Sequence, residues 1–281
     1  MEATLITGAS SGIGEAFARR LAGKKHNLVL VARNEKKLAA LCDELMLEHE
    51  ILAHYIAIDL NDYQADLRLF KETEHHKMKI NWLINNAGFG AMGDFAELDV
   101  ERELEMISLN VMAVVALTHR YLQKMRRRGS GTIINVSSTA GYQPIPYMAT
   151  YAATKSFVTA FTEAIAEENR PYGIRIMALC PGATETNFFA ASKIDDPFTV
   201  KGMQKPEEVV EAALEGLEKG KSKVISGWTN YFFAKAAKMA PNSLTTKVIA
   251  NKLRPKYGAE TTEEKEEKIQ KPKIEERKDD Q

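Results

Sequence analysis

Cysteine is scarce in this sequence: Cys42 and Cys180 are the only two among 281 residues. Neither has a second cysteine or a histidine beside it at the spacing of a metal site, and two cysteines cannot build a disulfide framework. The sequence therefore predicts no metal centre, and it favours a reducing, cytoplasmic location.

Long hydrophobic runs are also missing. No stretch of about 18 apolar residues occurs, so we expect no transmembrane helix. The first apolar segment begins at Thr4, which leaves no room for the basic region, apolar core and cleavage site of a signal peptide. Export by such a signal is not expected.

A net charge of either sign is absent. Lys plus Arg and Asp plus Glu number 38 each, and no segment before residue 260 concentrates one sign strongly enough to attract nucleic acid. Nucleic acid is therefore not an expected partner. The length fits one or two domains, and the motif spacing described below favours a single domain over residues 1–259. Residues 260–281 are charged with almost nothing apolar, so we expect a solvated, disordered tail there.

Short segments rich in Val, Ile and Leu alternate with helix-length amphipathic segments. This alternation predicts a doubly wound α/β domain, whose parallel sheet is covered by helices on both faces. The expected strands are residues 4–7, 28–32, 52–58, 82–84, 132–136, 174–179 and 223–226. The expected helices are residues 13–24, 35–49, 62–78, 100–127 and 150–171, with a further helix after Pro206.

A glycine-rich turn follows the first expected strand and opens the first helix. Gly8, Gly12 and Gly14 give the backbone the freedom for a tight turn and for close approach of a pyrophosphate, while the helix N-terminus favours an anion. Ser10 and Ser11 add hydroxyl donors. The pattern indicates a dinucleotide site, and its simpler alternative is an ordinary strand-to-helix turn.

The second expected strand ends at Ala32, where a site for NAD would usually place an acidic side chain on the ribose. Arg33 follows and supplies a forked cation that suits a 2′-phosphate, so the sequence favours NADP. The alternative is a surface arginine at a helix start. Lys36 and Lys37 either assist Arg33 or are simply solvated.

Tyr151 and Lys155 lie four residues apart on an expected helix and so share one face. A free phenol has a pKa of about 10, and an adjacent ammonium favours phenolate and lowers that pKa. The pair can therefore act as an acid and base. Taken alone, a Tyr and a Lys at this spacing are typical of a solvated helix face.

Ser138 lies thirteen residues before Tyr151, just after the expected strand 132–136. Ligands bind at the carboxyl ends of parallel strands, so Ser138 can hydrogen-bond a substrate oxygen as charge develops on it. A helix-cap or turn role is the alternative, and Ser137 is the rival for the same task.

Together these residues resemble the short-chain dehydrogenase/reductase family over about residues 4–186, in its NADP-preferring branch similar to ketoacyl and hydroxysteroid reductases. The resemblance implies a Rossmann-type, three-layer α/β/α fold with seven strands in the order 3-2-1-4-5-6-7. It implies catalysis by Ser138, Tyr151, Lys155 and Asn110. Asn110 would kink its helix, hold a water and connect Lys155 to solvent. A homodimer or homotetramer is a further expectation from the family.

The same resemblance assigns the cofactor contacts. Ser11 is a departure, because many NADP-specific members carry a second basic residue at that position. The implied cofactor-binding residues are Gly8, Ser10, Ser11, Gly12, Ile13, Gly14, Arg33, Asp59, Leu60, Asn86, Ala87, Gly88, Tyr151, Lys155, Pro181, Gly182, Thr184 and Thr186.

The function that follows is NADP(H)-dependent hydride transfer between the nicotinamide and a carbonyl or secondary alcohol. A hypothesis of another class is a regulator or scaffold that holds NADPH without turnover. A screen of carbonyls and alcohols separates the two.

Residues 187–203 are expected to form a lid over the substrate. They include Phe188, Phe189, Phe198 and Met203, which favour a partly hydrophobic substrate, or else pack into the core. Between the catalytic Ser and Tyr lie four further candidates for the pocket lining, namely Tyr142, Pro144, Ile145 and Tyr147.

A helical segment is expected at about residues 228–255. Residues 231–239 within it combine aromatic and apolar side chains with Lys235 and Lys238. One hypothesis is attachment to a membrane surface. We favour packing on the substrate pocket or at a subunit contact instead.

Overall fold

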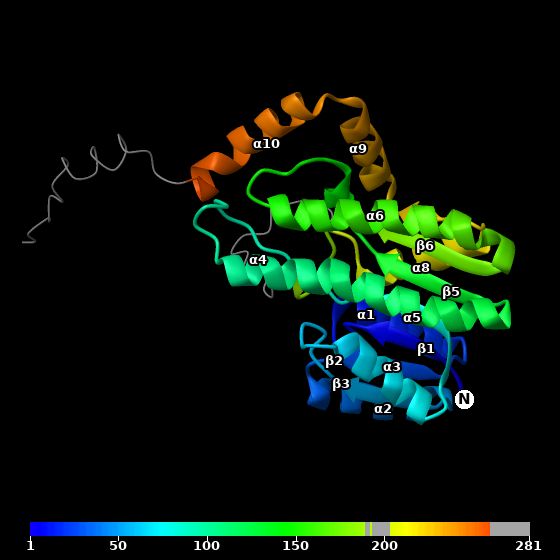
Figure 1. The fold of residues 1–281 in the computed structure, drawn as a ribbon. Helices are drawn as coiled ribbons and strands as arrows, with labels where there is room; N and C mark the ends of the chain where they lie inside the picture. The colour runs from blue at the N-terminus through cyan, green and yellow to red at the C-terminus, as the bar shows by residue number, and fades with distance from the viewer. Residues whose placement is uncertain (189–191, 193–202, 259–281) are drawn as a thin grey trace, which may run out of the picture.

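The computed structural model describes residues 1–188, 192 and 203–258. Its seven parallel strands run in the order β3-β2-β1-β4-β5-β6-β7, which confirms the predicted doubly wound fold (Figure 1). The expected tail, residues 260–281, lies outside the described residues. The strands are β1 (Glu2–Thr7), β2 (Leu28–Ala32), β3 (Ala53–Ala57), β4 (Lys79–Asn85), β5 (Gly131–Val136), β6 (Ile174–Cys180) and β7 (Lys223–Ile225).

Helices cover both faces of the sheet. Successive strand residues point to opposite faces, so Ile6 and Leu30 belong to one core cluster while Leu5 and Val29 belong to the other. The first cluster packs under α1 (Gly12–Gly23), α2 (Glu35–His49) and α8 (Pro206–Glu218). The second packs under α3 (Ala65–His75), α5 (Ala113–Arg128) and α6 (Ala149–Asn169). The result is the predicted three-layer arrangement.

One expected helix is interrupted. The segment predicted as one helix over residues 100–127 consists of α4 (Val100–Ile107), a π-helical turn (Ser108–Met112) and α5. The extra residue in a π-turn rotates the chain locally and turns Asn110 inward, where it is fully buried. Helix α3 is also shorter than predicted, because Gln64 before it has a left-handed backbone (φ 53°).

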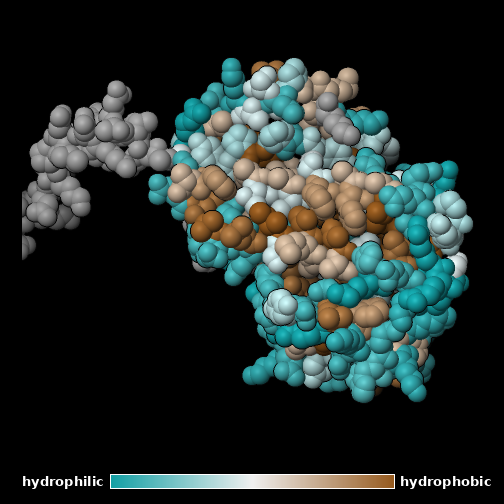
Figure 2. Space-filling model, in the orientation of Figure 1, coloured by the Kyte–Doolittle hydropathy of each residue, from teal (hydrophilic) through white to brown (hydrophobic). Residues whose placement is uncertain are grey.

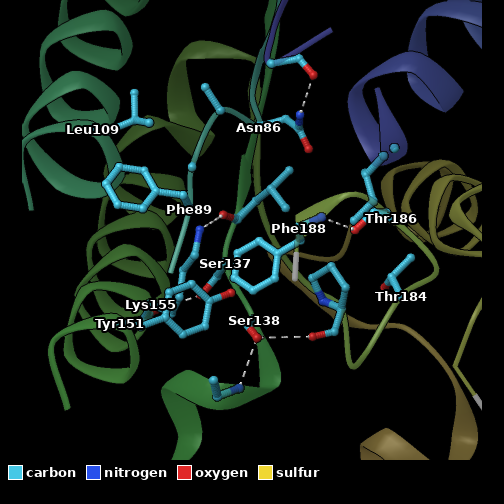
Figure 3. A pocket seen from close by; sticks show the side chains of 18 of the residues that line it. Asn86, Phe89, Leu109, Ser137, Ser138, Tyr151, Lys155, Thr184, Thr186 and Phe188 are labelled. Carbon is cyan, nitrogen blue, oxygen red and sulfur yellow. Dashed lines mark hydrogen bonds between the residues drawn. The ribbon is translucent and has the colours of Figure 1, made fainter. Parts of the chain in front are cut away.

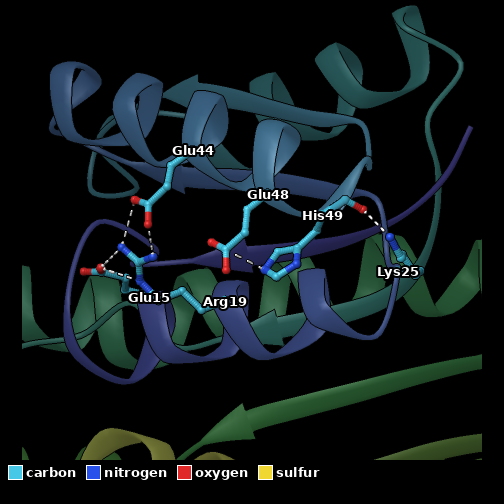
Figure 4. A network of polar contacts seen from close by, with 6 residues as sticks. All are labelled: Glu15, Arg19, Lys25, Glu44, Glu48 and His49. Atoms are coloured by element: carbon cyan, nitrogen blue, oxygen red, sulfur yellow. Dashed lines mark hydrogen bonds and ion pairs between the residues drawn. The ribbon is translucent and has the colours of Figure 1, made fainter.

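Helices α1 and α2 are joined at the surface by a charged network (Figure 4). Arg19 of α1 donates from Nη1 to Glu44 of α2 at 2.6 Å and from Nε to Glu15 at 2.9 Å. At the other end of the helices, Lys25 Nζ donates to the carbonyl oxygen of His49 at 2.8 Å. Exposed pairs each contribute about 0–1 kcal/mol. The network nevertheless ties together the two helices that flank the glycine-rich turn.

Two of the described helices lie outside the three layers. Helices α9 (Trp228–Met239) and α10 (Asn242–Tyr257) follow β7 and account for the helical segment expected there.

A hydrophobic stripe runs between α4 and α6 (Figure 2), where Leu104, Ile107, Met112 and Phe157 are exposed. Within the part of the chain that the structure describes, no helix has the length and apolar character to cross a membrane.

Candidate active site

A cavity of about 880 Å³ opens at the carboxyl ends of the strands, where the order reverses between β1 and β4 (Figure 3). This crevice is where open α/β sheets bind ligands. All the catalytic and cofactor-binding residues named from the sequence line it, except Gly14 and Asn110. Those lining it are Gly8, Ser10, Ser11, Gly12, Ile13, Arg33, Asp59, Leu60, Asn86, Ala87, Gly88, Ser138, Tyr151, Lys155, Pro181, Gly182, Thr184 and Thr186.

The glycine-rich turn is held against β4. Gly8 has a left-handed backbone (φ +66°), and Asn86 Nδ2 donates to the carbonyl oxygens of Thr7 and Gly8 at 3.0 and 3.2 Å. Gly14 lies behind the turn rather than in the cavity, because a Cβ placed on it would come within 2.3 Å of the Gly8 oxygen. Gly14 thus permits the close packing of helix and turn.

The start of α1 fits an anion. Ser11 is its N-cap residue and makes no side-chain cap hydrogen bond, although the first N–H groups of any helix need an acceptor. These donors, the hydroxyls of Ser10 and Ser11, and the lack of side chains at Gly8 and Gly12 suit a dinucleotide pyrophosphate.

The rim at the end of β2 carries a cation. Arg33 lines the cavity with 77% of its side chain exposed, and its Nη1 lies 3.5 Å from Asp59 Oδ2. Lys37 lines a smaller depression beside Ser10 and Ser11. This rim can therefore hold a second phosphate group. Lys37 supplies a positive charge near Ser11, the position where many NADP-specific members carry a basic residue.

Ser138 and Ser137 differ clearly in their surroundings. The Ser137 hydroxyl is buried and donates to the Lys155 carbonyl oxygen at 2.7 Å. Ser138 Oγ accepts from the Ala140 N–H at 3.1 Å, so it caps the short helix Thr139–Tyr142, and it also interacts with Tyr151. The cap interpretation is therefore correct for Ser138, yet its hydroxyl still faces the cavity.

Tyr151 and Lys155 both come from α6 and are buried. Burial raises the pKa of Tyr151 to about 12, against the opposite effect of the Ser138 hydrogen bond. Burial lowers the pKa of Lys155 to about 8. The Tyr151 shift is opposite to the one predicted from the adjacent ammonium, because desolvation of the buried phenol is its largest cause. Lys155 Nζ donates to the Val136 carbonyl oxygen at 3.0 Å.

Asn110 sits behind the cavity wall. Its Oδ1 accepts from the Phe89 N–H at 3.2 Å, and its Nδ2 donates to the Phe89 carbonyl oxygen at 2.9 Å and to Thr154 Oγ1 at 3.2 Å. A Cβ placed on Gly88 would lie 2.8 Å from Asn110 Oδ1 and 3.5 Å from Lys155 Nζ. Asn110 is therefore close to the Lys155 ammonium but separated from the cavity by the chain at Gly88.

The remaining expectations concern the substrate end. Phe188 lines the cavity, with its ring centroid 5.3 Å from that of Tyr151. Phe189 and Phe198 lie outside the described residues. Of the four candidates between Ser138 and Tyr151, only Ile145 lines the cavity. Pro144 does not line it, the Tyr142 hydroxyl contacts Cys180 Sγ at 3.8 Å, and the Tyr147 ring pairs with that of Tyr257.

Some lining residues were not anticipated from the sequence. Helix α9 contributes part of the wall, which its amphipathic pattern had suggested only in general terms, and α4 contributes residues that no local motif marks. Among the unanticipated residues are Arg102, Glu105, Leu109, Gln143 and Met148, whereas Phe233, Ala234 and Ala237 belong to the segment 231–239 that was expected to pack on the substrate pocket or at a subunit contact.

Comparisons with known proteins identify the family of this chain. The short chain dehydrogenase family matches residues 2–196. A 7beta-hydroxysteroid dehydrogenase of Mediterraneibacter gnavus is 32% identical over 80% of this chain and 86% of its own length. An NADP-dependent 3-hydroxy acid dehydrogenase of Schizosaccharomyces pombe is 31% identical over 79% and 89% of the two chains.

A solved structure of the same family also resembles this chain. The short-chain dehydrogenase from Sphingobium yanoikuyae in complex with NADPH matches with a TM-score of 0.76 and 33% identity, over 80% of this chain and 87% of that chain. This protein therefore belongs to the short-chain dehydrogenase family of oxidoreductases.

Proposed function

We propose that this protein is an NADP(H)-dependent oxidoreductase that moves a hydride between the nicotinamide and a carbonyl or secondary alcohol. The observation that carries the proposal is the position of the Tyr151 hydroxyl. Tyr151 and Ser138 line the same cavity as the glycine-rich turn, so an acid/base group and an anion site share one space.

The proposed chemistry divides between cofactor and protein. Bound NADPH supplies the hydride that reaches the carbonyl carbon. Tyr151, kept protonated by burial, gives its proton to the carbonyl oxygen, and Ser138 hydrogen-bonds that oxygen. Lys155 supplies a positive charge beside the phenolate that is left. Asn110 orders the route by which Tyr151 regains its proton, and its buried contacts next to Lys155 support this role.

The preference for NADP rests on the rim. Arg33 presents an exposed guanidinium just after β2, and β2 ends in Ala32 instead of the acidic residue that a site for NAD would usually have there. Lys37 lines the depression beside Ser11. Two relatives support the same choice: the 3-hydroxy acid dehydrogenase of Schizosaccharomyces pombe is NADP-dependent, and the Sphingobium yanoikuyae dehydrogenase is in complex with NADPH. The remaining cofactor contacts are proposed as the sequence predicted them.

The substrate is proposed to be partly hydrophobic. Apolar side chains line the cavity around Tyr151, namely Phe188, Ile145, Met148 and Phe233. A hydroxysteroid dehydrogenase among the relatives is consistent with this chemistry.

A second copy of the chain is proposed to cover the hydrophobic stripe between α4 and α6, giving the expected homodimer or homotetramer.

The test is steady-state kinetics with NADPH and NADH across a panel of aldehydes, ketones and secondary alcohols. We expect turnover with NADPH, and we expect Arg33→Ala to raise the KM for NADPH by about tenfold to a hundredfold while leaving NADH use unchanged. A charge-assisted hydrogen bond of about 1.5–3 kcal/mol accounts for that range. Arg127→Ala, an exposed arginine on α5, is the matched control.

Two results would contradict the proposal. NADPH binding without turnover on any substrate class would favour the regulator hypothesis. Equal effects of Arg33→Ala on NADPH and NADH would remove the role of Arg33 at the 2′-phosphate.

A further inference from the structure

The outer sides of α9 and α10 expose large apolar side chains. On α9, Trp228 is 79% exposed, Phe232 63% and Met239 87%. On α10, Leu244 and Val248 are more than half exposed. Exposed apolar side chains that gather on one element indicate an interaction site.

Helical geometry sets these residues apart from the packed sides of the two helices. Trp228, Phe232 and Met239 are four and seven residues apart and so share one side of α9, whereas Ala234 is buried and lines the cavity. The Trp228 and Phe232 rings stack with centroids 6.3 Å apart. Leu244 and Val248 are one turn apart on α10, and the buried residue of that helix is Leu253. In Figure 1 the two helices lie beyond α6 and splay apart at a wide angle from the turn that joins them, and this pair of helices is termed the α9–α10 hairpin.

The charge on this hairpin is one-sided. Residues 228–258 contain six basic residues and no acidic one, although the whole chain is neutral. The rest of the chain therefore carries an acidic excess of six. Lys247 and Arg254 are exposed beside the Leu244 and Val248 stripe, and Lys235 Nζ lies 4.9 Å from the Tyr231 ring centroid. The six are Lys235, Lys238, Lys247, Lys252, Arg254 and Lys256.

We propose that the α9–α10 hairpin binds the surface of a lipid bilayer that contains anionic lipid. Trp and Tyr side chains partition to the headgroup level of a bilayer, and basic side chains are attracted to its negative surface. Two copies of the hairpin facing each other would bring like charges together, which disfavours pairing through this face. Neither helix is long and apolar enough to span the membrane, so the contact is interfacial.

The placement has a consequence for the cavity. Ala234 of α9 is buried and lines it, and Phe233 lines its edge while 75% exposed, whereas Trp228 and Phe232 are exposed on the same helix and do not line the cavity. A hairpin lying on a bilayer therefore brings the cavity wall close to the lipid, where apolar compounds concentrate. This binding is independent of turnover.

Flotation of the full chain with vesicles tests the proposal. We expect the protein to float with phosphatidylcholine vesicles that contain phosphatidylglycerol, to float at least about tenfold less with pure phosphatidylcholine, and to be released as salt rises. The double substitution Trp228→Ser and Phe232→Ser should reduce the bound fraction by about tenfold or more. Leu47→Ser is the matched control, because Leu47 is 88% exposed on α2.

A second variant isolates the charge. Lys247→Glu with Arg254→Glu should lose binding to the anionic vesicles, whereas Lys71→Glu with Lys221→Glu, at exposed sites elsewhere, should keep it. NADPH binding measured on every variant reports that the fold is intact.

Several results would overturn the proposal: no flotation with either vesicle, equal flotation with neutral and anionic lipid, or unchanged binding by the Trp228→Ser and Phe232→Ser variant. A change in the molar mass of that variant without lipid would assign the face to a subunit contact instead.

Discussion

At the scale of single residues, the titration of Lys155 makes the site sensitive to pH. Its pKa is lowered from 10.5 to about 8 by burial, so Lys155 is protonated below that pH and loses its charge as the pH rises through it. Tyr151, with a pKa of about 12, stays protonated over the same interval. We predict that kcat for carbonyl reduction is steady below pH 8 and falls above it, approaching about tenfold per pH unit.

The rate at saturating NADPH from pH 6 to 10 checks this prediction. Lys155→Arg is the control, because a guanidinium stays charged throughout the range, so the alkaline fall should disappear even where the rate is lower. A wild-type rate that holds to pH 10 would show that the Lys155 charge is not required.

The sequence placed its catalytic and cofactor candidates correctly at the cavity, except Gly14 and Asn110, because these residues sit in motifs that follow strands directly. Ser138 follows β5 and Arg33 follows β2, and the carboxyl ends of parallel strands meet at one edge. The Tyr151 pKa could not be predicted in the same way, because it depends on enclosure by residues such as Phe188, far along the chain.

At the scale of elements, the junction of the glycine-rich turn with α1 depends on a missing side chain. A Cβ on Gly14 would meet the Gly8 oxygen at 2.3 Å and Asn86 Nδ2 at 2.6 Å. We predict that Gly14→Ala lowers the free energy of unfolding by about 1–3 kcal/mol, as overpacking does elsewhere. Denaturant unfolding without cofactor measures it.

Gly23 provides the comparison in the same helix. A Cβ there would meet only His49 Cε1 at 3.9 Å, so Gly23→Ala should be neutral or stabilise by up to about 1 kcal/mol. Equal effects of Gly14→Ala and Gly23→Ala on the free energy of unfolding would contradict this prediction, because they would mean that the chain accommodates a Cβ at Gly14 without strain.

The elements themselves were largely predictable, since apolar periodicity marks each strand and helix. The interruption between α4 and α5 was not, because nothing in the local pattern over residues 100–127 favours a π-turn. Asn110 gave the only signal, through the resemblance, and its bonds to Phe89 and Thr154 depend on chain segments distant in sequence.

At the scale of the whole molecule, the observed strand order β3-β2-β1-β4-β5-β6-β7 confirms the order that the resemblance implied. The outer helices α9 and α10 were harder to place. Their amphipathic pattern predicted helices, yet it did not say that one side of α9 would line the cavity while Trp228 faced outward. Which side of α9 lines the cavity depends on the position of β7 in the sheet, because α9 follows β7 directly.

The central claim is that Tyr151 exchanges the proton in an NADP(H)-dependent reaction. The most direct measurement compares NADPH binding and kcat for wild type, Tyr151→Phe and Tyr142→Phe, whose hydroxyl contacts Cys180 instead of the cavity. We predict that Tyr151→Phe binds NADPH as wild type does and loses about 10²–10⁴-fold in kcat, while Tyr142→Phe keeps its turnover. Wild-type turnover by Tyr151→Phe would contradict the account.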